Sequence, residues 1–280
     1  MDPTLAVITV NYRSQDALTE LIESLAAADT LPLQTLVVNN EAGASLSLPA
    51  LEGLAIVDAG GNLGYGGGIN AGARRLAESV EWILVTNPDV RIEPDALSRL
   101  LEVARSHTKA GSVGPRILET TGEVYPSARE LPSLRTGIGH ALLANVWLSN
   151  PWTRRYRGET RETTGTWRET GWLSGSCVLV RRAAFEAIGG FDDSYFMYFE
   201  DVDLGARLTR AGWRNLYVPG ATVTHTGAHS TSTAADSMRA EHHRSAYQYL
   251  SRKYAGWYLA PLRVALKAAL MLRARFTSRG

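Results

Sequence analysis

The chain has 280 residues, of which 45% are hydrophobic and 20% charged, a composition that suits a globular protein with a full core. Its formal net charge of +1 gives no general attraction to nucleic acid, and we expect no such partner. The single cysteine, Cys177, excludes an intrachain disulfide. We see no signal-peptide pattern, and Arg263 and Lys267 interrupt the longest apolar stretch near the C-terminus. We therefore expect a cytoplasmic protein.

Short apolar runs alternate with helical patterns through the first hundred residues. The strand patterns lie at 5–10, 35–38, 54–57 and 82–86, and the helical patterns lie at 16–25, 69–76 and 97–104. Such alternation predicts an α/β fold with a mostly parallel central sheet and helices on both faces. Ligands of such sheets bind at the carboxyl ends of the strands.

The second half of the chain is less regular. Residues 121–170 are rich in Arg, Thr, Gly and Pro and predict long loops, with one helix near 138–147. Further on, the patterns predict a strand at 172–181, helices at 183–188 and 200–211, and strands at 214–218 and 221–225. The last forty residues predict helix.

Polar residues follow each of the first four predicted strands. Asn11 and Tyr12 follow the first strand, Asn39 the second, Asn62 the third and Asn87 the fourth. An asparagine at a strand end is commonly a turn former, so each position alone is a weak signal. Their shared place at one edge of a parallel sheet favours a nucleotide site.

A glycine-rich stretch at 60–68 follows the third predicted strand. Gly66, Gly68 and Ala71 satisfy the G-x-G-x-x-A form of a dinucleotide-binding turn, with Asp89 downstream as a ribose-binding acid. The stretch is too long for a tight strand-to-helix turn and does not follow the first strand. We therefore favour glycines that let the backbone approach a sugar or a phosphate, with a structural loop as the alternative.

Asp89 stands in a Thr-Asn-Pro-Asp turn at a strand end. A diphosphate leaving group needs its charge neutralised, and a hard cation such as Mg²⁺ or Mn²⁺ on a carboxylate does this. One carboxylate provides only one protein ligand for a metal ion, and His225 is the best candidate for a second. The alternative for His225 is a histidine without a metal role.

The strongest chemical signal is the segment 189–204, where five aromatic side chains and a methionine surround carboxylates at the start of a predicted helix. Glu200, Asp201 and Asp203 would also suit a helix N-terminus for its dipole alone. Acids beside an aromatic run are, however, partly desolvated, which raises a carboxyl pKa toward that of a useful general base. The aromatic wall suits a sugar ring.

These motifs, in order from residue 5 to about 255, resemble the inverting glycosyltransferases of family two, which have the GT-A fold. The resemblance is greatest to bacterial rhamnosyltransferases that act on lipid-linked precursors. The matching pieces are Val10-Asn11-Tyr12, Val37-Val38-Asn39-Asn40, 62–70, Asn87-Pro88-Asp89, 172–176, 196–204, Arg207-Leu208, Ala211-Gly212-Trp213 and His225-Thr226-Gly227. Two positions depart from the family pattern, because Asn39 stands where Asp is frequent and Asn87 replaces the first acid of the metal motif.

The resemblance implies a role for each matched residue. Asp201 is expected to be the catalytic base, with Glu200 orienting it or the acceptor, and Asp89 is expected to hold Mg²⁺ or Mn²⁺ with His225. The residues expected at the nucleotide sugar are Val10, Asn11, Tyr12, Asn39, Asn62, Gly66, Asn70 and Asn87, and those expected at the acceptor are Trp172, Ser174 and Gly175.

The resemblance also implies a reaction and its partners. We expect residues 1–120 to form the nucleotide-sugar-binding half and residues 121–240 the acceptor-binding and catalytic half of one GT-A domain. The best expectation is transfer of L-rhamnose from dTDP-rhamnose to a hydroxyl of a glycan, such as a polyprenyl-diphosphate-linked sugar in cell-wall or polysaccharide synthesis. The alternatives are another hexose or galactofuranose, a non-catalytic nucleotide-sugar sensor, and an NAD-dependent oxidoreductase.

Residues 241–280 form a basic helical tail. No acidic residue follows Glu241, whereas eight basic residues do: Arg244, Arg252, Lys253, Arg263, Lys267, Arg273, Arg275 and Arg279. An apolar stripe accompanies them at helical spacing, made of Leu259, Leu262, Leu266 and Leu270. We expect this tail to contact an anionic membrane surface at the inner face of the cell membrane, or alternatively to pack on the core.

Overall fold

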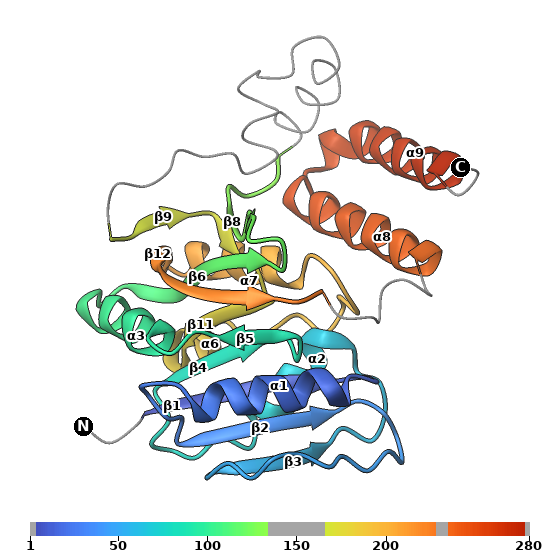
Figure 1. Cartoon of the computed structure of the whole chain (residues 1–280). Coiled ribbons are helices and arrows are strands. Elements are labelled where there is room, and N and C mark those ends of the chain that lie inside the picture. Colours follow the sequence, from blue (N-terminus) through green and yellow to red (C-terminus); the bar gives the residue numbers. More distant parts are fainter. Residues whose placement is uncertain (1–3, 134–165, 228–234, 278–280) are drawn as a thin grey trace.

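A ten-stranded sheet runs through the described part of the chain, residues 4–133, 166–227 and 235–277 of a computed structural model (Figure 1). The strand order is β3-β2-β1-β4-β11-β6-β12-β5, with β7 paired to β6 and β9 paired to β12. The strands are β1 (Leu5–Asn11), β2 (Gln34–Asn39), β3 (Leu54–Asp58), β4 (Trp82–Thr86), β5 (Val90–Ile92), β6 (Ala110–Glu119), β7 (Val124–Tyr125), β9 (Arg168–Thr170), β11 (Cys177–Arg181) and β12 (Arg214–His225). A second, two-stranded sheet joins β8 (Ala128–Arg129) to β10 (Trp172–Leu173).

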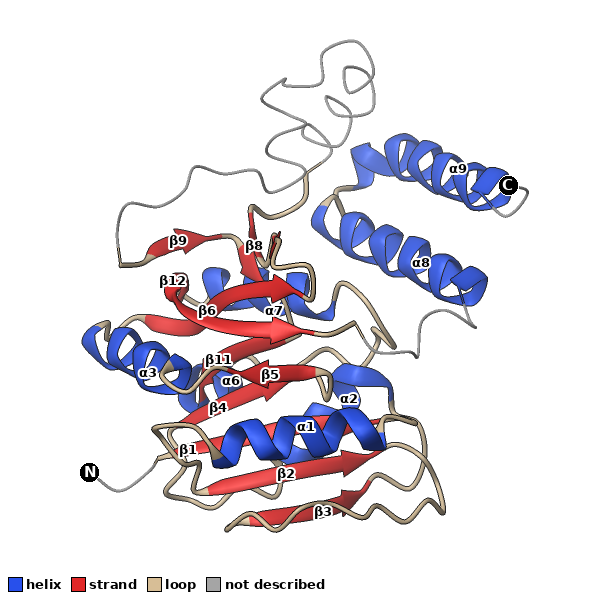
Figure 2. Cartoon of the chain, viewed as in Figure 1, coloured by secondary structure: helices blue, strands red, loops and turns tan. Residues whose placement is uncertain are grey.

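Helices cover both faces of the large sheet (Figure 2). The alternation of side chains along β1 shows why, since Leu5 and Val7 enter one apolar cluster whereas Ala6 and Ile8 enter the other. The first cluster is closed by α1 (Gln15–Ala26) and α3 (Ala96–Ser106), and the second by α2 (Gly64–Ala73), α6 (Arg182–Ala187) and α7 (Glu200–Arg210). The predicted α/β fold with helices on both faces is confirmed.

The strand order reverses at β1, which places several polar strand ends together. β1 pairs in parallel with β2 on one side and with β4 on the other. The carboxyl ends of these three strands therefore meet at one edge of the sheet, the place where open α/β sheets bind ligands. Beyond β4 the sheet is mixed, because β11 runs antiparallel to both β4 and β6.

Two element predictions are corrected by the structure. The predicted strand at 172–181 is two strands in different sheets, separated by the turn at 174–176. The two predicted strands at 214–218 and 221–225 are one strand, β12, with a register irregularity between Val218 and Thr222. Pro219 and Gly220 fall at that irregularity, because proline lacks the N–H that a regular ladder requires. The helix predicted near 138–147 lies outside the described residues.

The glycine-rich stretch is also corrected, because α2 begins inside it at Gly64. A Cβ on Gly66 would lie 2.9 Å from Phe191 Cβ, and one on Gly68 would lie 2.8 Å from Val10 Cγ2. The missing Cβ atoms of these two glycines thus permit close packing of α2 against Phe191 and Val10. Being helical and buried, they form no dinucleotide-binding turn.

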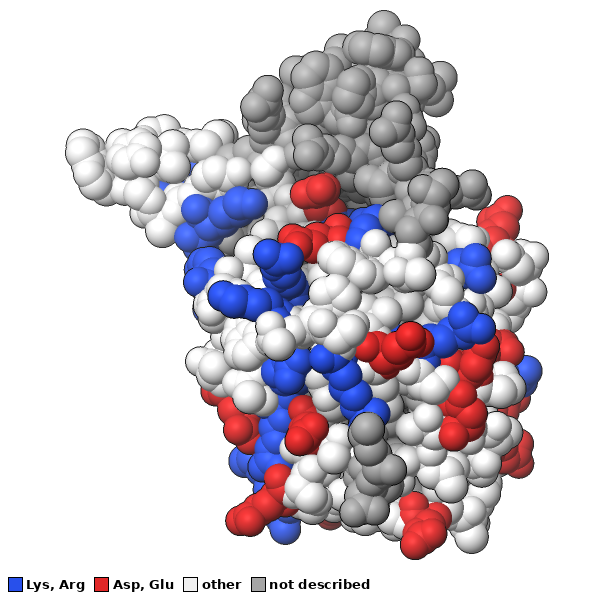
Figure 3. All heavy atoms as spheres, turned by 90° about the vertical axis from the view of Figure 1, so that its left-hand side faces the viewer, with Lys and Arg blue, Asp and Glu red and all other residues white. Residues whose placement is uncertain are grey.

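Two long helices follow the sheet domain and lie side by side at its edge (Figure 1). They are α8 (Ala235–Lys253) and α9 (Ala260–Thr277), joined through the short 3₁₀ helix η1 (Trp257–Leu259). The hydroxyl of Ser245 in α8 donates a hydrogen bond to the carbonyl oxygen of Met197 at 2.9 Å, which ties the pair to the segment before α7. None of the helices among the described residues combines the length and apolar character needed to cross a membrane. One face of the molecule carries both acidic and basic side chains (Figure 3).

Candidate active site

Two buried asparagines shape the chain where β1 and β2 end. Asn11 Nδ2 donates to Asn39 Oδ1 at 2.9 Å. Asn39 Nδ2 in turn donates to the carbonyl oxygens of Glu41 at 3.2 Å and Ala44 at 3.0 Å, so it holds the turn that follows β2. An aspartate at position 39 would accept the first hydrogen bond but could not donate the other two. Asn39 is thus matched to this local turn.

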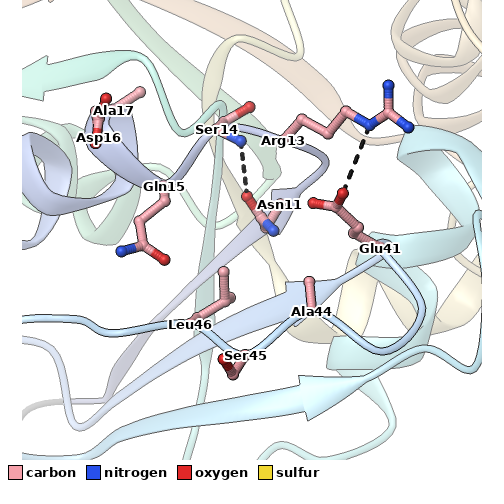
Figure 4. Close-up of a pocket in the computed structure, with 10 residues that line it drawn as sticks. All are labelled: Asn11, Arg13, Ser14, Gln15, Asp16, Ala17, Glu41, Ala44, Ser45 and Leu46. Atoms are coloured by element: carbon pink, nitrogen blue, oxygen red, sulfur yellow. Dashed lines mark hydrogen bonds and ion pairs between the residues drawn. The ribbon is translucent and has the colours of Figure 1, made fainter.

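A pocket opens beside this asparagine pair (Figure 4). The Arg13 backbone has a φ of +58°. Its side-chain Nε lies 3.5 Å from Glu41 Oε1 across the pocket. The exposed ring of Tyr12 lies under the Arg13 guanidinium. The lining residues come from the start of α1 and from the turn after β2: Asn11, Arg13, Ser14, Gln15, Asp16, Ala17, Glu41, Ala44, Ser45 and Leu46. The pocket lies at the sheet edge where a nucleotide is expected.

The remaining expected nucleotide-sugar residues on this side lie around α2. Asn62 Oδ1 accepts a hydrogen bond from the backbone N–H of Gly64 at 3.0 Å, and Val10 and Gly66 are buried. Asn70 is engaged with the segment before α7, since it donates to the carbonyl oxygen of Phe191 at 2.9 Å and to a carboxylate oxygen of Asp193 at 2.7 Å. These four residues therefore do not line the pocket that Asn11 lines.

A second polar corner forms where β4, β5 and β12 meet. His225 Nε2 lies 3.1 Å from Asp89 Oδ1 and 3.4 Å from Asn87 Nδ2. The pairing of β12 with β5 and the hydrogen bond from the Thr226 N–H to the Asp89 carbonyl oxygen, at 2.9 Å, bring these residues together. The structure thus places the two expected metal ligands side by side, although 136 positions separate them.

This corner fits Mg²⁺ or Mn²⁺ as a partial ligand set. It offers a half-buried carboxylate oxygen and an imidazole nitrogen. No group of three or more His, Cys, Asp or Glu side chains suited to a metal occurs among the described residues. Magnesium at nucleotide sites commonly takes only one or two protein ligands and completes its shell with phosphate oxygens and waters. Asp89 and His225 would hold such an ion only together with a bound diphosphate.

The expected catalytic base is fixed by backbone donors. Asp201 Oδ2 accepts a hydrogen bond from the Gly175 N–H at 3.0 Å, and Asp201 Oδ1 accepts one from the Val202 N–H at 2.7 Å. Gly175 is held from its other side by the hydroxyl of Tyr65, which donates to the Gly175 carbonyl oxygen at 2.6 Å. Burial raises the pKa of Tyr65, and the nearby Glu200 carboxyl adds to this effect, so the phenol keeps the proton that it donates.

Glu200, next to the base, stands in a different environment. Its side chain is buried, and Oε2 has no hydrogen-bond partner in the described structure. Burial, reinforced by the neighbouring Asp201 charge, raises the pKa of Glu200 to about 8. Burial also raises the pKa of Asp201, but the N–H groups of Gly175 and Val202 oppose that shift by binding the charged form. The backbone donors therefore favour a proton on Glu200 over a proton on Asp201.

The turn at 174–176 connects the base to the metal corner. The Ser176 carbonyl oxygen accepts hydrogen bonds from the Asn87 N–H at 2.9 Å and from the Thr86 hydroxyl at 3.2 Å. The Ser174 hydroxyl donates to Ser176 Oγ at 3.2 Å. The metal corner, this turn and Asp201 are thus linked by one chain of hydrogen bonds.

Three aromatic residues frame the start of α7. Trp172 donates from Nε1 to the Glu130 carbonyl oxygen at 3.2 Å and packs beside Gly205 of α7, where a Cβ would meet Trp172 Cβ at 2.7 Å. Tyr198 and Phe199 both have a φ of +66°, a rare conformation for aromatic residues that re-aims the chain directly before Glu200. Of the expected acceptor residues, Gly175 contacts Asp201 directly, Ser174 precedes it in the same turn, and Trp172 packs against α7 at Gly205.

Sequence reasoning missed the roles of several residues around this site. Tyr65 and Ser176 fall inside the matching motifs, which could have indicated them. Arg13 and Glu41 stand just after the polar ends of β1 and β2. Arg129, which affects the pKa of Asp201, carries no motif signal.

Comparisons with known proteins agree with this geometry. The sequence model of a family described as "Glycosyltransferase like family 2" matches residues 3–247. The chain is 42% identical, over its whole length and 94% of the relative, to the N-acetylglucosaminyl-diphospho-decaprenol L-rhamnosyltransferase of Mycobacterium tuberculosis. It is 28% identical to the rhamnosyltransferase WbbL of Escherichia coli, over 88% of this chain and 92% of that protein.

Solved structures show the same architecture. The mannosyltransferase PcManGT from Pyrobaculum calidifontis, in complex with GDP-Man and Mn²⁺, superposes with a TM-score of 0.58 at 15% identity, covering 98% of this chain and 76% of that one. GalNAc-T7 with UDP, GalNAc and Mn²⁺ superposes with a TM-score of 0.56 at 11% identity, covering 79% and 43%. The fold is the GT-A fold. Given the span of the family match and the identity to the mycobacterial relative, the chain belongs to the family 2 glycosyltransferases.

Proposed function

We propose that this glycosyltransferase moves L-rhamnose from dTDP-rhamnose to a hydroxyl of a polyprenyl-diphosphate-linked sugar, with inversion at the anomeric carbon. The observation that carries the proposal is the position of Asp201, fixed at the turn 174–176 that also borders the metal corner. The choice of sugar and acceptor is supported by the 42% identity to a rhamnosyltransferase named for a diphospho-decaprenol acceptor.

Asp201 acts as the general base in the proposed mechanism. It takes the proton of an acceptor hydroxyl, and the oxygen of that hydroxyl forms a bond to the anomeric carbon. The bond from this carbon to the nucleotide diphosphate breaks on the opposite face, with the electron pair leaving on the diphosphate. Because the two N–H groups occupy one direction at each Asp201 oxygen, a remaining lone pair is available for the incoming proton. Glu200, protonated beside it, adds no second negative charge.

The donor would extend from the Asn11 pocket to the metal corner. The base and ribose would occupy the pocket of Figure 4, and the diphosphate would extend to Asp89 and His225, which would hold Mg²⁺ or Mn²⁺ with it. When bound, this ion supplies positive charge that stabilises the leaving diphosphate. Asn87 would lie beside that diphosphate.

We further propose that the enzyme works at the inner face of the cell membrane, where a lipid-linked acceptor is presented. Trp257 and Tyr258 are 86% and 69% exposed, and Lys267 is exposed on the neighbouring helix α9. Aromatic and basic side chains of this kind favour the headgroup region of an anionic leaflet.

The proposed transfer is tested with purified protein, dTDP-rhamnose and a short-chain prenyl-diphosphate-linked N-acetylglucosamine. We expect a disaccharide whose new linkage, read by NMR, has the anomeric configuration opposite to that of the donor. Asp201→Asn should reduce turnover by ~10²–10⁴-fold, because a positioned general base contributes about that much, while donor binding stays near wild type.

Other activated hexoses and UDP-galactofuranose serve as competing donors in the same assay. Preference for one of them would replace rhamnose in the proposal, and retained configuration would contradict the mechanism. Donor binding without any transfer would favour a nucleotide-sugar sensor.

A further inference from the structure

Arg129 is held in a fixed orientation beside the catalytic turn. It lies on β8, which pairs with β10, so that Arg129 stands opposite Trp172. Its Nε donates to the Pro126 carbonyl oxygen at 2.7 Å, and its guanidinium carbon lies 5.7 Å from the ring centroids of both Tyr125 and Trp172. One hydrogen bond and two aromatic faces thus determine where the guanidinium lies.

The two terminal nitrogens of Arg129 bind no other group of the described chain. Among the described residues, they form no hydrogen bond and no ion pair with a carboxylate. Other arginines of the fold use these atoms on the protein itself: Arg182 Nη1 donates to the Ala77 carbonyl oxygen at 2.6 Å, and Arg181 Nη2 donates to the His107 carbonyl oxygen at 3.2 Å. Arg129 therefore keeps a planar, charged donor group available for a ligand.

This free group shares its surroundings with the base. Burial raises the pKa of Asp201 and the N–H groups of Gly175 and Val202 lower it, and the Arg129 charge also lowers it. Burial raises the pKa of Tyr125, which lies under the Arg129 guanidinium. The Arg129 charge and the Ser174 hydroxyl lower this pKa, and the Asp201 charge raises it. Arg129 is thus near Asp201 without forming an ion pair with it, and it stands opposite Trp172, one of the residues expected at the acceptor.

We propose that Arg129 binds the diphosphate of the lipid-linked acceptor through its terminal nitrogens. In such an acceptor the diphosphate is attached to the same sugar whose hydroxyl meets Asp201, so an anion-binding group is required a short way from the base. A guanidinium suits this task because it stays charged and can donate two parallel hydrogen bonds to phosphate oxygens. The proposal rests on the proposed function, because it names a binding site for the acceptor of that reaction.

The test compares two acceptors, one with and one without the diphosphate: prenyl-diphosphate-linked N-acetylglucosamine and the uncharged prenyl glycoside of the same sugar. Calorimetry with the full chain measures the affinity for each. We expect Arg129→Ala to weaken binding of the diphosphate compound by about 10- to 100-fold, the loss typical of charge-assisted hydrogen bonds, and to leave the glycoside unaffected. Arg129→Lys should retain part of the affinity, since lysine binds phosphate as a point charge.

A matched control is Arg99→Ala, which removes an exposed arginine of α3 paired with Asp95. It should change neither affinity, and unchanged dTDP binding verifies that each variant is folded. Equal weakening of both acceptors by Arg129→Ala would overturn the proposal in favour of a packing role. Weakened dTDP binding in Arg129→Ala beside a normal melting temperature would move the residue to the donor side and likewise overturn it.

The two proposals can fail separately. Arg129-dependent binding of the diphosphate compound without any sugar transfer would reject the proposed reaction and support the anion site. Transfer with an undiminished preference for the diphosphate acceptor in Arg129→Ala would support the reaction and reject the anion site.

Discussion

Neighbouring carboxylates with unequal surroundings lie at the centre of the site. Asp201 is matched by two backbone donors, whereas Glu200 Oε2 is buried without a partner. A buried charge without compensation is costly, so the fold favours the neutral form of Glu200. This difference has a consequence for stability that can be measured without any substrate.

Glu200 should make the protein less stable as the pH rises. Its pKa is raised from the ordinary 4.5 to about 8, so between these values the folded state binds more protons than the unfolded state. The contribution of Glu200 to the free energy of unfolding is then greatest below pH 4.5. It is lost as the pH rises toward 8, by at most about 1.4 kcal/mol per pH unit. Glu200→Gln should remove this decline.

Thermal denaturation of wild type and Glu200→Gln between about pH 5 and pH 8.5 measures the effect. The two melting curves should diverge as the pH rises, with the variant the more stable at the alkaline end. Glu102→Gln, on the exposed side of α3, is the control and should follow wild type. Parallel behaviour of Glu200→Gln and wild type would show that Glu200 does not hold its proton.

The metal corner leads to a second prediction at this scale. Asp89→Ala removes the carboxylate that lies 3.1 Å from His225 Nε2, and it should weaken dTDP binding and abolish the increase in affinity that Mn²⁺ gives. Calorimetric titration of dTDP with and without Mn²⁺ measures both effects. An unchanged Mn²⁺ effect in the variant would mean that the ion is held by phosphate alone or at another site.

Local motifs predicted some site residues but could not predict their partners. Asp89 and His225 were paired from their places at strand ends, and the structure brings them together. Arg129 could not be found in this way, because its importance comes from Tyr125 and Trp172, one of which is distant in sequence. Asn70 matched a motif, yet the structure engages its amide with Phe191 and Asp193.

Among the elements, α2 shows how close packing depends on glycine. A Cβ on Gly72 would lie 2.7 Å from Ile8 Cγ2 and 3.0 Å from Val38 Cγ2, both on fully buried side chains of the sheet. Gly72→Ala gains up to about 1 kcal/mol in helix propensity but overpacks a core that cannot yield, at about 1–3 kcal/mol. We expect a net loss of about 1 kcal/mol in the free energy of unfolding.

Urea denaturation of Gly72→Ala against Gly67→Ala tests this balance. The Cβ added at Gly67 meets no atom of the sheet within 4 Å; its near neighbours are Leu63 Cβ at 3.1 Å and Asp193 Oδ1 at 3.7 Å, and Leu63 is the exposed residue that precedes α2, where the backbone can shift. The control variant should therefore be neutral or more stable than wild type, since it keeps the propensity gain. Equal stability of the two variants would show that α2 can shift away from the sheet.

Element predictions succeeded where periodicity was strong and failed where tertiary pairing decides. The pattern of residues 172–181 predicts one strand. Gly175, however, forms hydrogen bonds with Tyr65 and Asp201 instead of a strand partner, and this turn divides the segment. The Pro219-Gly220 pair reads as a strand end, but β6 continues alongside and keeps β12 whole. The pattern of one segment contains no information about the neighbour that pairs with it.

At the scale of the whole molecule, the C-terminal helices extend beyond the sheet domain. The expected apolar stripe is half-buried at Leu259, Leu262 and Leu266, whereas the large exposed apolar side chains are Trp257, Tyr258 and Val264. The side chain of Leu270 lies outside the described part. We expect contact with the membrane to involve these exposed groups together with the basic residues that follow Glu241.

Deleting residues 261–280 should release the protein from anionic liposomes while leaving dTDP binding intact. The deletion removes Arg263, Lys267, Arg273, Arg275 and Arg279, each worth up to about 1 kcal/mol near an anionic surface. Sedimentation with anionic vesicles measures the effect, and neutral vesicles are the control. Wild-type binding should fall with added salt, because exposed charges are screened over about 10 Å at 0.1 M. Full-length protein that stays in the supernatant at low salt would contradict the membrane contact.

The hydrogen bonds around the turn at 174–176 also determine when, during folding, the chain can become active. Its contacts join residues that are 89, 110 and 138 positions apart, between Asn87 and Ser176, Tyr65 and Gly175, and Asn87 and His225. Contacts at such separation form slowly, because the entropy of closing long loops is lost before they contribute. A ribosome-bound chain that ends before His225 would therefore lack the metal corner, and donor binding should arise only after the last strand of the sheet has been made.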